Sequence, residues 1–219
     1  MLRPLTILLG LAVVTLALAS CKKEAPPPPD ENLLRAASRA HVRHVSDEWP
    51  ETPGRVGLAT ILAQELEIAD THAQLAIKDP SNLEAILMHL RHVRHALDPS
   101  SEPNGPGKGF GVLRAAKETA KHIELAATVE GASNSVKLHS LHVATTANNV
   151  AHWGGQVMQI TDEVLAAKSI MSSYASAKQI ADMVRVMRFG QGTRTWRADE
   201  GGLQQLQQHL GFLLAGEGM

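Results

Sequence analysis

The sequence predicts an all-α protein: an antiparallel helical bundle built from two helical-hairpin repeats of about 50 residues each, with flanking helices. Two observations on composition carry the prediction of helix. Aromatic residues make up only 3% of the chain, and alanine and leucine are abundant, a balance that favours helix over strand. A third observation is the use of histidine, with eleven copies against three phenylalanines and one tyrosine. Several of these histidines recur at a fixed interval.

Residues 1–20 have the layout of a secretory signal. Arg3 supplies the positive charge, residues 5–18 form an apolar run, and the small residues Ala19 and Ser20 stand before a cleavage point. The apolar run is short for a membrane span, and Cys21 and two lysines follow it directly. The tetrapeptide Leu18-Ala19-Ser20-Cys21 resembles the lipobox of bacterial lipoproteins.

This resemblance implies that the chain is cleaved before Cys21, that Cys21 carries lipid, and that the lipid bilayer is a partner of the mature protein. The resemblance also implies a periplasm-facing, membrane-anchored location, and Lys22 in place of a retaining aspartate favours the outer membrane. Residues 21–30 include four consecutive prolines, which favour a stiff, extended spacer. We therefore expect the folded domain to span residues 31–219.

The composition excludes several classes of site and partner. Cys21 is the only cysteine, so zinc sites built on paired cysteines, covalent c-type haem and disulfides are excluded. The net charge of −1 does not provide the excess of positive charge that is typical of nucleic-acid-binding proteins. No nucleophile and base stand at a recognisable spacing, so a non-enzymatic role is favoured over an enzymatic one.

The helices of the domain follow from apolar periodicity and from breaks at proline and glycine. Residues 58–76 show the pattern most clearly, with one apolar and one polar face. A loop rich in proline and glycine, residues 98–109, is interpreted as a hairpin connector. The predicted helices span residues 31–48, 55–78, 82–97, 110–129, 133–153 with a continuation to 168, 175–188 and 203–214.

A shift of 50 residues superposes histidines of two predicted hairpins: His72 falls on His122, His89 on His139 and His92 on His142. His41 and His44 form an upstream half-copy with the same spacing. In each hairpin the first two histidines flank the turn at about 13 Å, so they lie at one height. If both turns lie at the same end of the bundle, four histidines share one layer of the core.

The predicted metal ligands are these four level histidines, namely His72, His89, His122 and His139. Further candidate ligands are His92, His142, Glu65, Glu118, His41 and His44. A buried neutral imidazole needs a partner for its donor and its acceptor, and a transition metal satisfies several imidazoles at once. The candidate cofactors are Zn, Cu, Fe or Ni, or a non-covalent haem. His95, His152 and His209 are interpreted as histidines with no ligand role.

Two functions therefore remain open. The first is a membrane-anchored periplasmic lipoprotein that binds a transition metal or haem through histidines, for carriage, storage, sensing or electron transfer. The alternative is a structural or adaptor lipoprotein of the cell envelope that binds another protein and no metal. The architecture is similar to soluble b-type cytochromes and haemerythrin-like proteins at the level of the fold only.

Overall fold

The computed structural model describes residues 31–192 and 197–219. The predicted signal, Cys21 and the proline-rich spacer lie outside these residues. Within them the chain forms α-helices, one short 3₁₀-helix and no strand, which confirms the all-α prediction. The helices are α1 (Glu31–Ser46), η1 (Pro53–Arg55), α2 (Leu58–Ala76), α3 (Leu83–Leu97), α4 (Val112–Thr128), α5 (Asn134–Ala167), α6 (Ile170–Phe189) and α7 (Leu203–Glu217).

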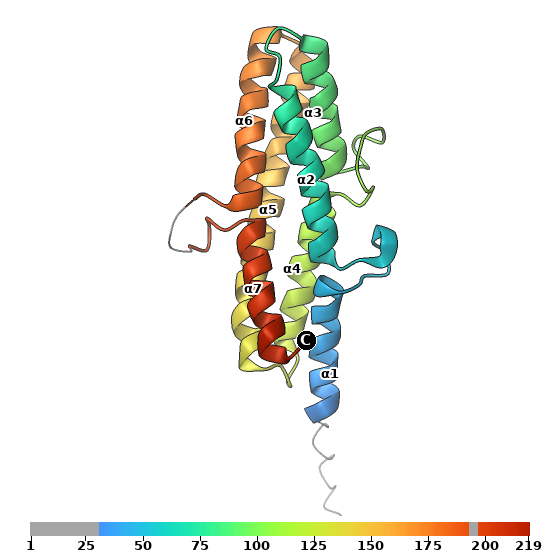
Figure 1. Ribbon diagram of the computed structural model, residues 1–219, viewed down its shortest axis with the longest axis vertical. Helices are drawn as coiled ribbons and strands as arrows, with labels where there is room; N and C mark the ends of the chain where they lie inside the picture. Colours follow the sequence, from blue (N-terminus) through green and yellow to red (C-terminus); the bar gives the residue numbers. More distant parts are fainter. Residues whose placement is uncertain (1–30, 193–196) are drawn as a thin grey trace, which may run out of the picture.

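The helices form an elongated bundle of four antiparallel columns (Figure 1). α1 and α2 follow one another in the first column, α3 and α4 in the second, and α6 and α7 in the fourth. The 34-residue helix α5 fills the third column alone. One half of the bundle therefore contains α2, α3, α6 and the end of α5, and the other contains α1, α4, α7 and the beginning of α5.

The loop between α3 and α4 corrects one prediction from the sequence. Residues 98–111 do not reverse the chain as a hairpin connector would; α4 continues in the direction of α3 (Figure 1). The α2–α3 turn and the α4–α5 turn consequently lie at opposite ends of the bundle. The predicted layer of four level histidines required both turns at one end, so that arrangement is wrong.

Helix α5 continues through Gly154 and Gly155, as the sequence allowed. A Cβ atom on Gly154 would lie 2.7 Å from Cδ2 of Leu113 on α4. A side chain at residue 154 would therefore require the Leu113 side chain, and to a smaller extent that of Met187, to move. Glycine inside a helix costs about 1 kcal/mol in helix propensity relative to alanine.

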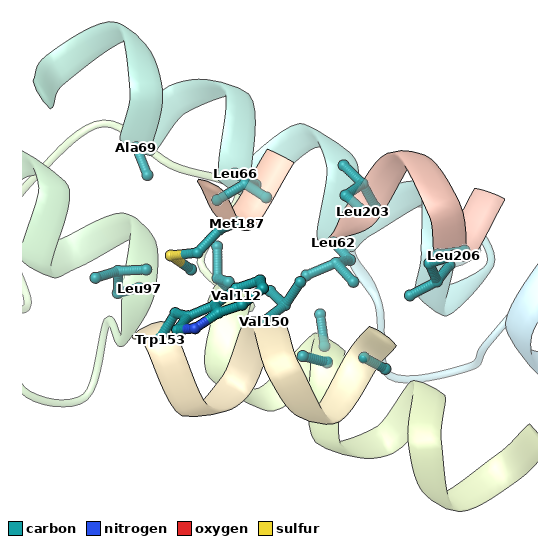
Figure 2. Packing of buried hydrophobic residues seen from close by; sticks show 14 of the residues in the cluster. Leu62, Leu66, Ala69, Leu97, Val112, Val150, Trp153, Met187, Leu203 and Leu206 are labelled. Carbon is teal, nitrogen blue, oxygen red and sulfur yellow. The ribbon is translucent and has the colours of Figure 1, made fainter. Parts of the chain in front are cut away.

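The apolar core runs along the centre of the bundle, and its middle part joins the two halves (Figure 2). There Leu66 of α2, Trp153 of α5 and Met187 of α6 pack against residues from the beginning of α4 and α7. Ion pairs at the surface add links between columns, including Arg94 to Asp162 at 3.2 Å and Arg39 to Glu217 at 3.3 Å. The two halves thus share one apolar core.

No helix within residues 31–192 or 197–219 combines the length and the apolar character needed to cross a membrane.

Candidate metal centres

Histidines gather at three separate places on the bundle. Each place brings together an i, i+3 pair from one helix and a single histidine from an antiparallel neighbour. We name them by their helices: the α1–α4 group contains His41, His44 and His122, the α2–α3 group contains His72, His89 and His92, and the α5–α7 group contains His139, His142 and His209. Each group could hold a metal ion, since its three ligand nitrogens lie within 4.8 Å of one another.

The α2–α3 group forms within a single helical hairpin. The spacing of three residues places His89 and His92 on one side of α3, where successive turns of the helix stack. His72 reaches them from α2, with its Nδ1 atom 3.1 Å from Nδ1 of His89 and 3.2 Å from Nδ1 of His92. All three side chains are half-buried at the seam between the two helices.

The α1–α4 group joins parts of the chain that are far apart in sequence. The pair His41 and His44 comes from α1, and Nδ1 of His122 on α4 lies 3.2 and 3.3 Å from their Nδ1 atoms. His122 is the most buried of these histidines, at 6% exposure. The indole ring of Trp49 packs against two of the imidazoles, with centroids 4.7 Å from His44 and 4.5 Å from His122.

The α5–α7 group repeats the same geometry between two other helices of the half that contains α1, α4 and α7. The pair His139 and His142 comes from α5, and Nδ1 of His209 on α7 lies 3.2 and 3.0 Å from their Nδ1 atoms. The ring of Phe212, one turn after His209, lies 5.8 Å from it and 5.6 Å from His139. The three groups therefore share one pattern of ligands on three different pairs of helices.

The predicted set of four histidines is divided among these groups. His72 and His89 lie together, but His122 belongs to the α1–α4 group and His139 to the α5–α7 group. The groups also lie at helix seams rather than in one core layer, because leucine, valine and alanine fill the centre of the bundle. His41, His44, His92 and His142, predicted as further ligands, each belong to one of the three groups.

Hydrogen bonding alone does not account for the contacts within a group. An imidazole nitrogen has one in-plane position, which holds either a proton or a lone pair. The Nδ1 atom of His72 has two neighbouring Nδ1 atoms at 3.1 and 3.2 Å, so it can form a linear hydrogen bond with one of them but not with both. The same holds for His122 and His209. Three converging lone pairs suit a single cation.

The spacing of the nitrogens also suits a metal ion. With metal–nitrogen bonds of about 2.0–2.1 Å, two imidazole nitrogens at a tetrahedral angle lie about 3.3 Å apart. The distances from each single histidine to its pair are 3.0–3.3 Å in all three groups. Nitrogens so placed need little movement to coordinate one ion.

The protein environment favours the neutral form of the single histidine in each group, namely His72, His122 and His209. The pKa of His72 falls to about 4, chiefly because of burial and then because of the nearby His92 and His89. Burial, His142 and His139 likewise lower the pKa of His209 to about 4. Burial is also the largest cause of the lowered pKa of His122. A metal competes with few protons at such ligands, because metal binding requires neutral imidazole.

The two predicted carboxylate ligands have different positions. Glu118 lies one turn before His122, with a carboxylate oxygen 3.8 Å from Nε2 of that histidine. Nε2 of His122 is buried and has no hydrogen-bond partner among the described residues. A short movement of Glu118 would let it accept this proton, which fixes the tautomer that presents Nδ1 to a metal. Glu118 thus lies beside His122 and belongs to none of the three groups.

Glu65 has a structural position instead. Its side chain is 1% exposed and accepts hydrogen bonds from the backbone N–H groups of Lys108 (3.0 Å), Phe110 (2.9 Å) and Gly111 (3.0 Å). It therefore holds the loop that leads into α4, and it belongs to none of the three groups.

Three histidines were interpreted from the sequence as lacking a ligand role. His152 is exposed, and His95 is buried at 8% exposure, where its Nδ1 donates to the carbonyl of Glu102 at 2.6 Å. His209 is the residue that sequence reasoning missed, because it stands alone on a short helix outside the 50-residue repeat. The available signal was a mismatch in number, because the three i, i+3 pairs at 41/44, 89/92 and 139/142 share only two single histidines of the repeat, His72 and His122.

Comparisons with models of protein families, with curated proteins and with solved structures found no match to this chain.

Proposed function

We propose that the chain binds transition-metal ions at three histidine-only sites, one at each group, and that it serves to carry or store them. The observation that carries the proposal is the convergence of three Nδ1 atoms at each site, where one in-plane position per nitrogen does not allow every contact to be a linear hydrogen bond. Three separate sites suit carriage or storage, because sensing or electron transfer needs only one.

The donor chemistry narrows the choice of ion. Imidazole suits Zn, Cu, Fe and Ni, but non-haem iron sites of the usual kind add a carboxylate ligand. None of the three groups contains a carboxylate. We therefore favour copper, zinc or nickel over iron.

A haem fits these groups poorly. Axial ligands on the two faces of a haem iron lie about 4 Å apart, twice the metal–nitrogen distance, with the porphyrin between them. The Nδ1 atoms here are 3.0–3.3 Å apart and their rings are in contact, with centroids 4.6 Å apart for His72 and His92. A bare ion is accommodated by this spacing and a porphyrin is not.

The location of the protein is part of the proposal. The lipobox that ends at Cys21 and the polyproline spacer support a lipoprotein whose domain stands off the bilayer on the periplasmic side. Lys22, in place of a retaining aspartate, supports a location at the outer membrane. Mass spectrometry of the mature chain tests this part, because a lipid adduct on an N-terminal Cys21 is expected, and an unmodified cysteine or an uncleaved leader would contradict it.

The metal proposal is tested with the full chain, purified in detergent without a histidine tag. After incubation with Zn(II), Ni(II) or copper and removal of the free ion, we expect bound metal and an X-ray absorption spectrum with nitrogen neighbours and the outer-shell scattering of imidazole. The matched control is the variant H72A/H122A/H209A, which loses the single histidine of every group. A helical parent chain that retains none of these metals would overturn the proposal and favour the adaptor function.

A further inference from the structure

The α1–α4 group differs from the α2–α3 group in what covers its ligands. In the α1–α4 group the Trp49 indole lies against His44 and His122, at 4.7 and 4.5 Å between ring centroids. In the α2–α3 group the ring contacts within the described residues are those among the three histidines themselves. One group therefore has an aromatic cover that the other lacks in this part of the chain.

The position of Trp49 is fixed by the short segment between α1 and α2. The backbone N–H of Trp49 donates to Val56 at 3.1 Å, and its carbonyl accepts from Thr52 N–H at 3.2 Å and from the Thr52 hydroxyl at 2.9 Å. Thr52 is itself buried. The start of α2 also packs closely on the end of α1, because a Cβ atom on Gly57 would lie 2.5 Å from the carbonyl carbon of Ser46.

The indole contacts the imidazoles through its ring, at interplanar angles of 64° to His44 and 56° to His122, and not through a hydrogen bond. Trp49 Nε1 is buried and has no hydrogen-bond partner among the described residues. An aromatic face attracts a cation by its quadrupole and excludes water from the side that it covers. An ion bound by the three imidazoles would therefore lie next to an aromatic ring, which hinders a further ligand from approaching past His44 and His122.

We propose that the α1–α4 group is a site for monovalent copper, held by His41, His44 and His122 and covered by Trp49. The inference rests on the proposed metal-binding function and names the ion for one of its three sites. Zn(II) normally takes four ligands, so a covered three-nitrogen site disfavours it. A single positive charge also costs less than two among neutral ligands, of which His122 is almost fully buried. The α2–α3 group, without this cover, accepts divalent ions as well.

The test compares two full-length chains that each retain one of these groups. One chain carries H72A/H209A and retains the α1–α4 group, and the other carries H122A/H209A and retains the α2–α3 group. Cu(I) is offered anaerobically as its bicinchoninate complex, and Zn(II) is offered with a chromophoric chelator in competition. We expect the α1–α4 chain to favour Cu(I) over Zn(II) at least about tenfold more strongly than the α2–α3 chain does.

The substitution W49L, placed in both chains, provides the matched control. It is expected to weaken Cu(I) binding about tenfold in the α1–α4 chain, to leave Zn(II) binding there unchanged or tighter, and to leave the α2–α3 chain unaffected. The substitution W49F keeps an aromatic face and is expected to retain Cu(I) binding. Circular dichroism checks that each variant remains helical. If W49L unfolds the chain, the difference in Cu(I) preference between the two chains that retain Trp49 decides the question.

The outcomes separate the two proposals. Equal Cu(I) preference in the two chains, or Cu(I) binding that is insensitive to W49L in a folded chain, would overturn the assignment of monovalent copper and leave the three-site function standing. A failure of both chains to bind either ion would overturn the proposed function itself.

Discussion

The α2–α3 group and the α1–α4 group each consist of three histidines at nearly the same spacing, but the chain assembles them in different ways. His72 lies 17 and 20 residues from its partners, across one short turn. His122 lies 81 and 78 residues from its partners, across the whole α2–α3 hairpin. The first group follows from a local supersecondary structure, whereas the second depends on the packing of the entire bundle.

This difference predicts that a metal at the α1–α4 group stabilises the fold more than one at the α2–α3 group. A ligand at 1,000 times its dissociation constant adds about 4 kcal/mol to the free energy of unfolding if the unfolded chain does not bind it. The unfolded chain brings histidines that are close in sequence together more readily than distant ones. The entropic free-energy cost of closing the loop between the histidines is about 1.4 kcal/mol larger for the α1–α4 group than for the α2–α3 group. Binding of the metal by the unfolded chain therefore cancels less of the stabilisation at the α1–α4 group.

The largest expected effect is therefore on thermal unfolding. We expect Cu(I) to raise the melting temperature of the full chain by about 10 °C or more, as followed by circular dichroism under anaerobic conditions. H122A should lose more of this rise than H72A, and H152A, which removes an exposed histidine outside the groups, should lose none. Equal losses in H122A and H72A would show that the difference in sequence separation has no energetic consequence.

A smaller effect is expected from pH on the metal-free chain. The pKa of His72 is about 4 in the folded state and 6.5 in the unfolded state, so between these values the unfolded chain binds more protons. Stability is therefore full above pH 6.5 and falls as the pH drops towards 4. Allowing for the partial exposure of His72, we expect this residue to account for about 2 kcal/mol of the loss.

Denaturant unfolding at several pH values measures this effect. The variant H72Q has no titrating group at that position, so its stability should fall less steeply between pH 6.5 and 4 than that of the parent. H152Q serves as the control for the loss of an exposed histidine. If the free energy of unfolding of H72Q falls with pH as steeply as that of the parent, the lowered pKa of His72 is contradicted.

The smallest expected effect concerns Glu118, which lies beside the α1–α4 group. Its carboxylate is placed to orient His122 through Nε2, at 3.8 Å. Carboxylates in such positions commonly contribute tenfold or more to metal affinity. E118Q should weaken Cu(I) binding at the α1–α4 group about tenfold and leave the α2–α3 group unchanged, as measured by chelator competition. E124Q, an exposed substitution on the same helix, is the control, and an equal effect of E124Q would indicate only a general loss of negative charge.

The same comparison shows what the sequence could predict. Helix periodicity and the 50-residue shift were sufficient to predict the all-α fold and to bring His72 and His89 together, because a hairpin with a short turn fixes both height and neighbour. They could not place His122 or His139. That depended on whether residues 98–111 reverse the chain, and a proline- and glycine-rich loop is compatible with either outcome.

The roles of the carboxylates were also beyond sequence patterns. Glu65 and Glu118 were both predicted from the sequence as further ligands. Only the structure shows that Glu65 accepts hydrogen bonds from three backbone N–H groups of the loop before α4, while Glu118 lies beside His122. His209 was missed for a related reason, since its partners on α5 reach it through packing and not through a repeat.

The central claim, that each group is an independent metal site, is tested most directly by counting ions with native mass spectrometry on the full chain loaded anaerobically with Cu(I). We predict that the parent chain binds three ions. Each of the variants H72A, H122A and H209A should bind two, and the variant with all three substitutions none. A parent that binds fewer than three ions, or single variants that retain the parental count, would contradict the claim.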